Sequence, residues 1–166
     1  MAKTRIRRTY SFKKLQRKFP KMVSDSINVI GSRLVKAIQD GIDKGVDVNG
    51  KKFEPLSENT KTLGGKKPLK RSGKMQKGIK KIPSNPNTLK FIIEMSAQSR
   101  GDIYGAFHNQ GYTNSFKKKQ WFKGATIPKR EWFGIPQSMK PGGSELKKAI
   151  KLIEPMIASA WKKNGN

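Results

Sequence analysis

The chain has 166 residues and no cysteine, and its 37 lysines and arginines stand against 11 aspartates and glutamates, a formal net charge of +26. The length favours one domain, the lack of cysteine excludes disulfides and thiolate metal sites, and no apolar run approaches the roughly 18 residues of a membrane span or forms the core of a signal peptide. Such an excess of positive charge predicts a polyanionic partner, nucleic acid above all, or a protein neighbour with an acidic face.

The first 21 residues are expected to form a basic N-terminal arm, since they hold nine lysines and arginines and no acidic residue. Such an arm can be disordered, or it can dock along phosphates or on a partner through its apolar side chains. Its candidate contacts to DNA or to an acidic partner are Arg5, Arg7 and Arg8.

An amphipathic helix is predicted from Met22 to about Lys44, after Pro20 and before Gly45. Its apolar residues recur every three or four positions, so they would form one face that packs against a sheet. These residues are Val23, Ile27, Ile30, Leu34, Ile38 and Ile42.

A projecting basic loop is predicted at about residues 57–77, where glycine, proline and lysine interrupt the apolar pattern. Within it, Ser57 can cap a short helical turn at 58–60, and another short helix is predicted to begin near Ser72. Residues 61–81 hold nine lysines and arginines and no acidic residue, and such a segment would bind DNA phosphates without sequence preference. Its candidate contacts to a DNA channel or to an acidic partner are Lys66, Lys67, Lys70, Arg71 and Lys74.

Two strands are predicted next, at 78–82 and 88–95, joined by a turn at 83–87 that is rich in proline and asparagine. A last helix is predicted to begin at Ser144, with Glu145 in its first turn. Its apolar stripe is predicted to comprise Leu146, Ile150, Ile153, Ile157 and Trp161.

The most aromatic stretch of the chain runs from Tyr104 to Ile135, and the core is expected to close there because aromatic side chains dominate buried area. The pattern predicts two strands, one starting at Tyr104 and one ending near Trp132, around a long projecting loop at about 112–125. Arg130, in the second of these segments, suits a bidentate bond to a partner's carboxylate.

The loop itself interleaves lysines with aromatic residues, and three interpretations stay open. It can anchor an interface with a subunit or a neighbouring ring, it can bind single-stranded nucleic acid by stacking and phosphate contacts, or it can be a solvated loop whose aromatics face the core. The interface is the first choice. The residues that would carry it are Phe116, Lys117, Lys118, Lys119, Trp121 and Phe122.

The single histidine, His108, is the one residue that invites a metal or catalytic interpretation. A metal site needs several convergent ligands, and the chain offers no second histidine, no cysteine and no paired-acid motif. We therefore predict that His108, Asn109 and Gln110 are polar groups that fix the end of a strand, and that the protein is neither an enzyme nor dependent on a cofactor or metal.

Four segments, in order, resemble the phage virion morphogenesis family, which includes tail-completion and neck proteins of long-tailed bacteriophages. Residues 52–60 (KFEPLSENT) and 69–75 (LKRSGKM) are similar to its "FxPLSxxT … LxxTGxL" run, residues 104–111 (YGAFHNQG) to "YAxxHQxG", and residues 127–134 (IPKREWFG) to "IPxRPFLG". The resemblance spans about residues 22–163. Departures are Ser72 in place of threonine, Glu131 in place of proline, and Trp132 beside the family's phenylalanine.

The resemblance implies an α+β fold, with amphipathic N-terminal and C-terminal helices packed on a mostly antiparallel β-sheet and long basic loops. The expected organisation is an arm at 1–21, a single domain at 22–163 and a tail at 164–166. The resemblance further implies a virion protein at the head–tail junction, made in the bacterial cytoplasm.

The partners implied are other copies in a ring, usually sixfold and sometimes twelvefold, with neighbouring head-connector and tail-terminator or tube proteins. Double-stranded DNA would pass through the lumen, and no membrane is involved. The alternative is a stand-alone basic protein that binds nucleic acid through the arm and the aromatic loop.

Overall fold

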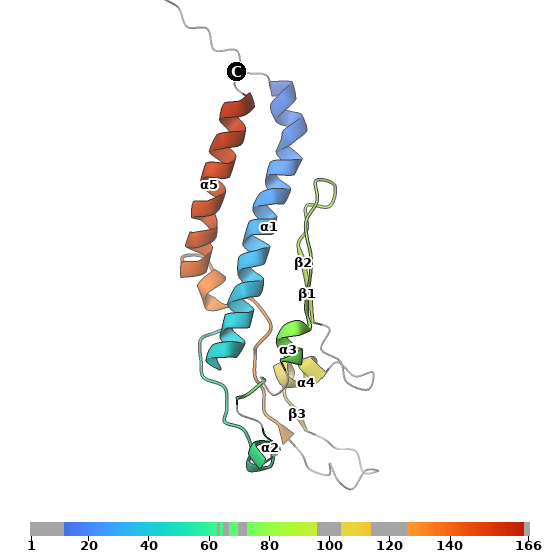
Figure 1. The fold of residues 1–166 in the computed structure, drawn as a ribbon, viewed down its shortest axis with the longest axis vertical. Helices are drawn as coiled ribbons and strands as arrows, with labels where there is room; N and C mark the ends of the chain where they lie inside the picture. Colours follow the sequence, from blue (N-terminus) through green and yellow to red (C-terminus); the bar gives the residue numbers. More distant parts are fainter. Residues whose placement is uncertain are drawn as a thin grey trace, which may run out of the picture.

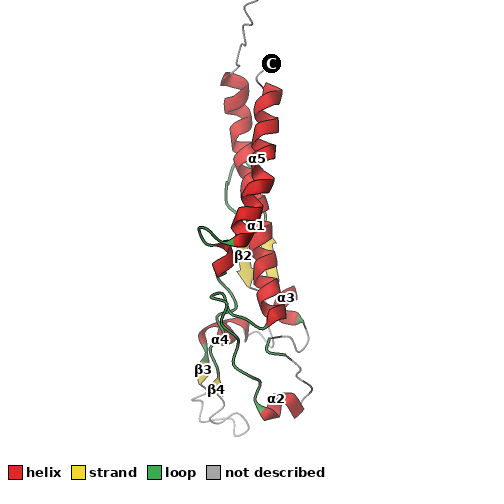
Figure 2. Cartoon of the chain, turned by 90° about the vertical axis from the view of Figure 1, so that its left-hand side faces the viewer, coloured by secondary structure: helices red, strands yellow, loops and turns green. Residues whose placement is uncertain are grey.

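The computed structural model describes residues 12–62, 64, 67–69, 73–95, 104–113 and 126–164. Two long helices, α1 (Phe12–Lys44) and α5 (Ser144–Asn164), run antiparallel and lie side by side (Figure 1). The start of α1 and the end of α5 lie at the same end of the molecule. In both views this end extends beyond the other described elements (Figure 2).

The remaining described elements lie beside α1 or at its C-terminal end (Figure 1). They are α2 (Glu58–Thr62), α3 (Lys74–Lys77), β1 (Ile79–Ile82), β2 (Ile92–Met95), α4 (Tyr104–Gln110), β3 (Tyr112–Thr113), β4 (Thr126–Ile127) and the 3-10 helix η2 (Gln137–Met139). β1 pairs with β2, and β3 pairs with β4, both antiparallel. The predicted α+β class is confirmed, although the described strands form two separate two-stranded sheets and not one layer under both helices.

Helix α1 begins at Phe12, ten positions before the predicted start at Met22, and runs through Pro20. A proline inside a helix removes one backbone hydrogen bond and crowds the preceding turn. Residues 13–18 (KKLQRK) have high helix propensity, which favours continuation of the helix on the N-terminal side of the proline. Half of the predicted arm is therefore helical, and residues 1–11 lie outside the described residues.

The hydrophobic core lies at the C-terminal end of α1. Its buried members are Ile38 and Ile42 of α1, Phe53, Met75 of α3, and Trp132, which is 2% exposed. Leu34, Leu69, Ile79, Met95 and Phe133 pack against them. The predicted α1 stripe and the predicted closure of the core on the aromatic stretch are both confirmed at this end of the molecule.

The β1–β2 hairpin is fixed to the middle of α1 by one asparagine and one glycine. The Asn28 side chain donates to the Ser84 carbonyl at 2.9 Å and accepts from the Ser84 amide at 2.7 Å. At Gly31, a Cβ would lie 2.4 Å from the Phe91 ring, so only glycine lets the ring approach the helix this closely. The predicted hairpin is confirmed, with its second strand shortened to 92–95.

The predicted stripe of α5 is only partly right. The residues buried against α1 are Ala149 and Ile153, whereas Ile150, Ile157 and Trp161 are 43–50% exposed. A single neighbouring helix covers a narrower band than the apolar arc of α5, and the small side chain of Ala149 marks where the two helices approach most closely.

Candidate assembly site

The loop for which the sequence predicts an interface role, residues 114–125, lies outside the described residues, but both of its ends are described. β3 precedes it and β4 follows it, and the strands pair with Tyr112 opposite Ile127 and Thr113 opposite Thr126. The predicted strand after the loop is found in a short form as β4, whereas β3 lies within the predicted bounds of the loop, about 112–125. Because the strands pair, the chain leaves the described body and returns to it at one place.

Residues 104–110, just before β3, form helix α4, so the prediction of a strand here is wrong. An aromatic-small-aromatic step fits a helical period as well as an alternating one, and a stretch this short does not discriminate between them. Gly111, with a φ of 77°, ends the helix in the left-handed conformation that glycine adopts readily.

Three hydrogen bonds tie α4 to the segment 130–133 that follows β4. The Trp132 Nε1 donates to the Gly105 carbonyl at 3.1 Å, the Phe133 amide to the Asn109 Oδ1 at 2.9 Å, and the Arg130 amide to the His108 carbonyl at 2.7 Å. At Gly105, a Cβ would lie 2.4 Å from the Met95 sulfur and 3.1 Å from the Trp132 ring, so the glycine lets both side chains pack closely on α4. These bonds make a fixed base for the loop.

Arg130 is part of this base, since its side chain is only 6% exposed. Its Nη2 donates to the carbonyl oxygens of Glu54 at 3.2 Å and Pro55 at 3.4 Å, which ties the segment after β4 to the chain between α1 and α2. Burial lowers the pKa of Arg130, and the nearby Glu54 carboxylate acts in the opposite direction. The sequence predicts a contact with a partner here, whereas in this chain the guanidinium binds backbone within the molecule.

His108 lies beside Arg130 in the same base. Burial, with the positive charge of Arg130 as the second cause, lowers the pKa of His108 from 6.5 to about 4, so the imidazole is neutral at pH 7. Within the part of the chain that the structure describes, no group of three or more histidine, cysteine or acidic side chains could hold a metal ion. The predicted role in fixing a chain end holds for the Asn109 side chain, at the end of a helix instead of a strand, whereas the buried Nδ1 of His108 has no hydrogen-bond partner among the described residues.

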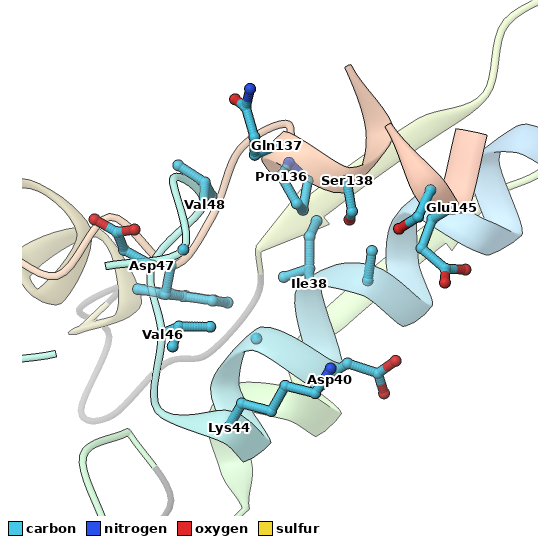
Figure 3. A pocket seen from close by; sticks show the side chains of 15 residues that line it. Ile38, Asp40, Lys44, Val46, Asp47, Val48, Pro136, Gln137, Ser138 and Glu145 are labelled. Atoms are coloured by element: carbon cyan, nitrogen blue, oxygen red, sulfur yellow. The ribbon is translucent and has the colours of Figure 1, made fainter. Parts of the chain in front are cut away.

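A cleft of about 220 Å³ separates the C-terminal half of α1 from the start of α5 (Figure 3). Three carboxylates line it, those of Asp40, Asp47 and Glu145, and they point in different directions. Asp47 accepts the amides of Asn49 and Lys51, both at 2.8 Å, and Glu145 bonds Lys148 at 2.6 Å and Arg33 at 3.5 Å. These partners account for two of the three carboxylates, so the cleft is a joint between elements and not a convergent ligand site.

The predicted contact residues fall into three groups in the structure. Lys67 and Lys74 are exposed, as a contact to DNA or to an acidic partner requires, and Arg130 is buried. The remaining ones lie outside the described residues: Arg5, Arg7, Arg8, Lys66, Lys70, Arg71, Phe116, Lys117, Lys118, Lys119, Trp121 and Phe122.

An exposed apolar surface on α5 is absent from the sequence-based prediction. Five large side chains of this helix, Ile150, Leu152, Met156, Ile157 and Trp161, are 41–50% exposed. The sequence does contain a signal for this exposed surface, which is the width of the apolar arc of α5. At 100° per residue, nine of the ten apolar positions from Leu146 to Trp161, all but Ala158, span about half of the helix circumference, which is more than one helix covers.

Comparison with known proteins gives one match. A model of the phage virion morphogenesis family matches residues 4–141. No curated protein and no solved structure matches the chain. Among the described residues, no helix combines the length and apolar character needed to cross a membrane.

Proposed function

The chain belongs to the phage virion morphogenesis family, and from that membership we propose that it is a tail-completion subunit of the phage neck, which joins the tail to the DNA-filled head. Its role as a structural protein of phage particle assembly follows from the family. The proposed form is a ring of identical subunits at the head–tail junction, sixfold as the first expectation and twelvefold as the alternative.

The fixed base under residues 114–125 is the observation that carries this proposal. β3 and β4 pair at the two ends of the loop, and Trp132, Arg130 and Asn109 hold the surrounding segments through four hydrogen bonds from their side chains. A fixed base at the two ends of the basic, aromatic segment predicted to be a loop suits a subunit that binds neighbours during assembly. If the loop orders only on contact, assembly becomes sequential, because the partner must be present to offset the entropy of ordering.

The proposed partners of the ring are a head-connector protein on one side and a tail-terminator or tube protein on the other. Double-stranded DNA would pass through the lumen. The exposed Lys67 and Lys74 belong to a basic segment that can meet either phosphates or acidic faces of these neighbours.

Reconstitution tests the proposal. Purified protein freed of nucleic acid is added to tails from a phage mutant that lacks it, followed by filled heads, and infectious particles are counted. The proposal predicts that infectivity depends on the added protein and that a Lys117, Lys118 and Lys119 to Glu variant restores less of it.

The contrary result is a protein that does not bind tails or restore infectivity but binds DNA tightly, with an affinity that falls steeply as salt increases. That outcome would favour a stand-alone nucleic-acid-binding protein, because counterion release makes phosphate binding salt-sensitive. A variant with the same number of Lys to Glu changes at the exposed Lys51, Lys52 and Lys90, which lie outside α5 and outside the basic segment, controls for net charge alone.

A further inference from the structure

Helix α5 packs on α1, but the described chain leaves a large part of its apolar surface exposed. Taking roughly 200 Å² for a large apolar side chain, the five half-exposed side chains of α5 leave on the order of 450 Å² uncovered. That total is within the roughly 300–600 Å² of the largest patch on a typical soluble monomer. It is divided between two sides of the helix, and a contact that uses one side from each partner would have an apolar centre smaller than that of a standard interface, which buries about 800 Å² on each partner.

The exposed apolar side chains of α5 form two separate groups, one on each side of the band of α5 that packs on α1. The first, which we term the indole flank, comprises Ile150, Ile157 and Trp161. The second, the groove flank, comprises Leu152 and Met156. Ala149 and Ile153 lie between the flanks and are buried against α1.

The two flanks differ in shape in a complementary way. The indole flank presents the half-exposed ring of Trp161. The groove flank contains a shallow groove of about 470 Å³, lined by Pro155, Met156, Ser159, Ala160 and Lys163. The groove lies at the same level of α5 as Trp161 and is open to solvent, so an aromatic ring can lie along it with Lys163 beside the ring face.

We infer that the α1–α5 helix pair is a self-association surface, on which the Trp161 ring of one copy occupies the groove around Met156 of the next copy. The inference rests on the proposed function, since it names the contact that would close the ring. A ring requires two different faces on each subunit, one for each neighbour, and the two flanks are such faces. Neighbouring α5 helices would then run in the same direction, which brings Trp161 level with the groove.

Charged side chains also lie at the flanks. Exposed Glu154 follows Ile150 by one helical turn and so lies on the indole flank, and exposed Lys163 lines the groove. These two side chains carry opposite charges and can pair in the proposed contact, although exposed Lys147 also lies one turn from Ile150.

Mass measurement of three variants tests the inference. Trp161→Glu disables the indole flank and Met156→Glu disables the groove flank, while Ile135→Glu changes a residue outside the two helices that is still more exposed, at 59%. Wild type and Ile135→Glu are expected to form the same oligomer in sedimentation experiments, and the two flank variants to associate at least tenfold more weakly. Circular dichroism checks that all variants keep the helical content of wild type.

Mixing the two disabled variants is the sharper test, because each keeps the flank that the other lacks. The contact predicts one-to-one pairs that grow no further. If instead the variants assemble like wild type, the surface is wrong while the ring proposal stands. A wild-type protein that stays monomeric overturns the inference.

Cysteine pairs give a second measurement that leaves Trp161 and Met156 in place, in a chain with no cysteine of its own. Ile157→Cys lies on the indole flank and Ser159→Cys in the groove. The double variant is expected to form a ladder of disulfide-linked oligomers, and either single variant to remain unlinked. Linked dimers of Ile157→Cys alone would show that like flanks meet, which contradicts the contact proposed here.

Discussion

At the scale of single residues, the protein stabilises its loop base with polar side chains that bind backbone. Arg130 reaches the carbonyls of residues 54 and 55, Asn109 accepts the Phe133 amide, and Trp132 donates to Gly105. Each bond joins segments far apart in the sequence, which explains why the local pattern predicts a partner contact for Arg130 whereas its guanidinium binds backbone within the molecule. The burial of His108 also gives the fold a dependence on pH.

His108 predicts loss of stability in mild acid. Its pKa is about 4 in the folded state because burial disfavours the imidazolium, against 6.5 when unfolded. Between these values the unfolded chain binds more protons, so the free energy of unfolding falls as pH falls through this window. We expect a loss of about 2 kcal/mol between pH 7 and pH 5, measured by urea denaturation. His108→Gln should remove most of this slope, and an unchanged slope in that variant would contradict the assignment.

At the scale of elements, the helix pair and the β1–β2 hairpin depend on different contacts with α1. The hairpin uses the two Asn28 bonds and the approach of Phe91 to Gly31, whereas α5 uses a narrow band of small and apolar side chains. Both the hairpin and α5 therefore depend on α1, but through separate residues. We expect that the hairpin can be loosened without disturbing α5.

Asn28→Ala tests this separation. Loss of two partly buried hydrogen bonds should cost roughly 1–3 kcal/mol and increase hydrogen exchange in β1 and β2, while exchange in α5 stays at the wild-type rate. Ser32→Ala, at an exposed position one turn further along α1, is the matched control. Equal acceleration in the hairpin and in α5 would show that the elements do not respond separately.

The sequence was sufficient to predict the elements whose apolar residues are strongly periodic or whose ends are marked by local caps and turns. The helices ending at Lys44 and starting at Ser144, the short helix at Glu58 and the 79–95 hairpin were all predicted, because caps, turns and apolar spacing are local. The helical state of residues 104–110 was not, since seven residues fit either period. The internal role of Arg130 depends on carbonyls of a distant segment, which a local pattern does not show.

At the scale of the whole molecule, the charge and the exposed apolar surface oppose each other. A net charge of +26 makes copies repel one another at low ionic strength, whereas apolar flanks on α5 favour their contact. Salt screens the repulsion and leaves the apolar contact largely unchanged. The response to salt therefore distinguishes association between copies from binding to DNA.

We expect self-association to strengthen when sodium chloride is raised from low to physiological concentration, and DNA binding to weaken over the same range. Sedimentation of the nucleic-acid-free protein measures the first, and fluorescence anisotropy of a labelled duplex the second. Trp161→Glu should abolish the first response and leave the second nearly unchanged. If both responses weaken together with added salt, contacts through bound nucleic acid hold the copies together instead.

The central claim, that this protein forms a ring joining tail to head, is tested most directly by averaged electron microscopy images of tails made with and without it. The account predicts a closed ring at the head-proximal end of wild-type tails, which is missing from the mutant's tails and returns when the purified protein is added. Identical head-proximal ends in the two preparations would contradict the account.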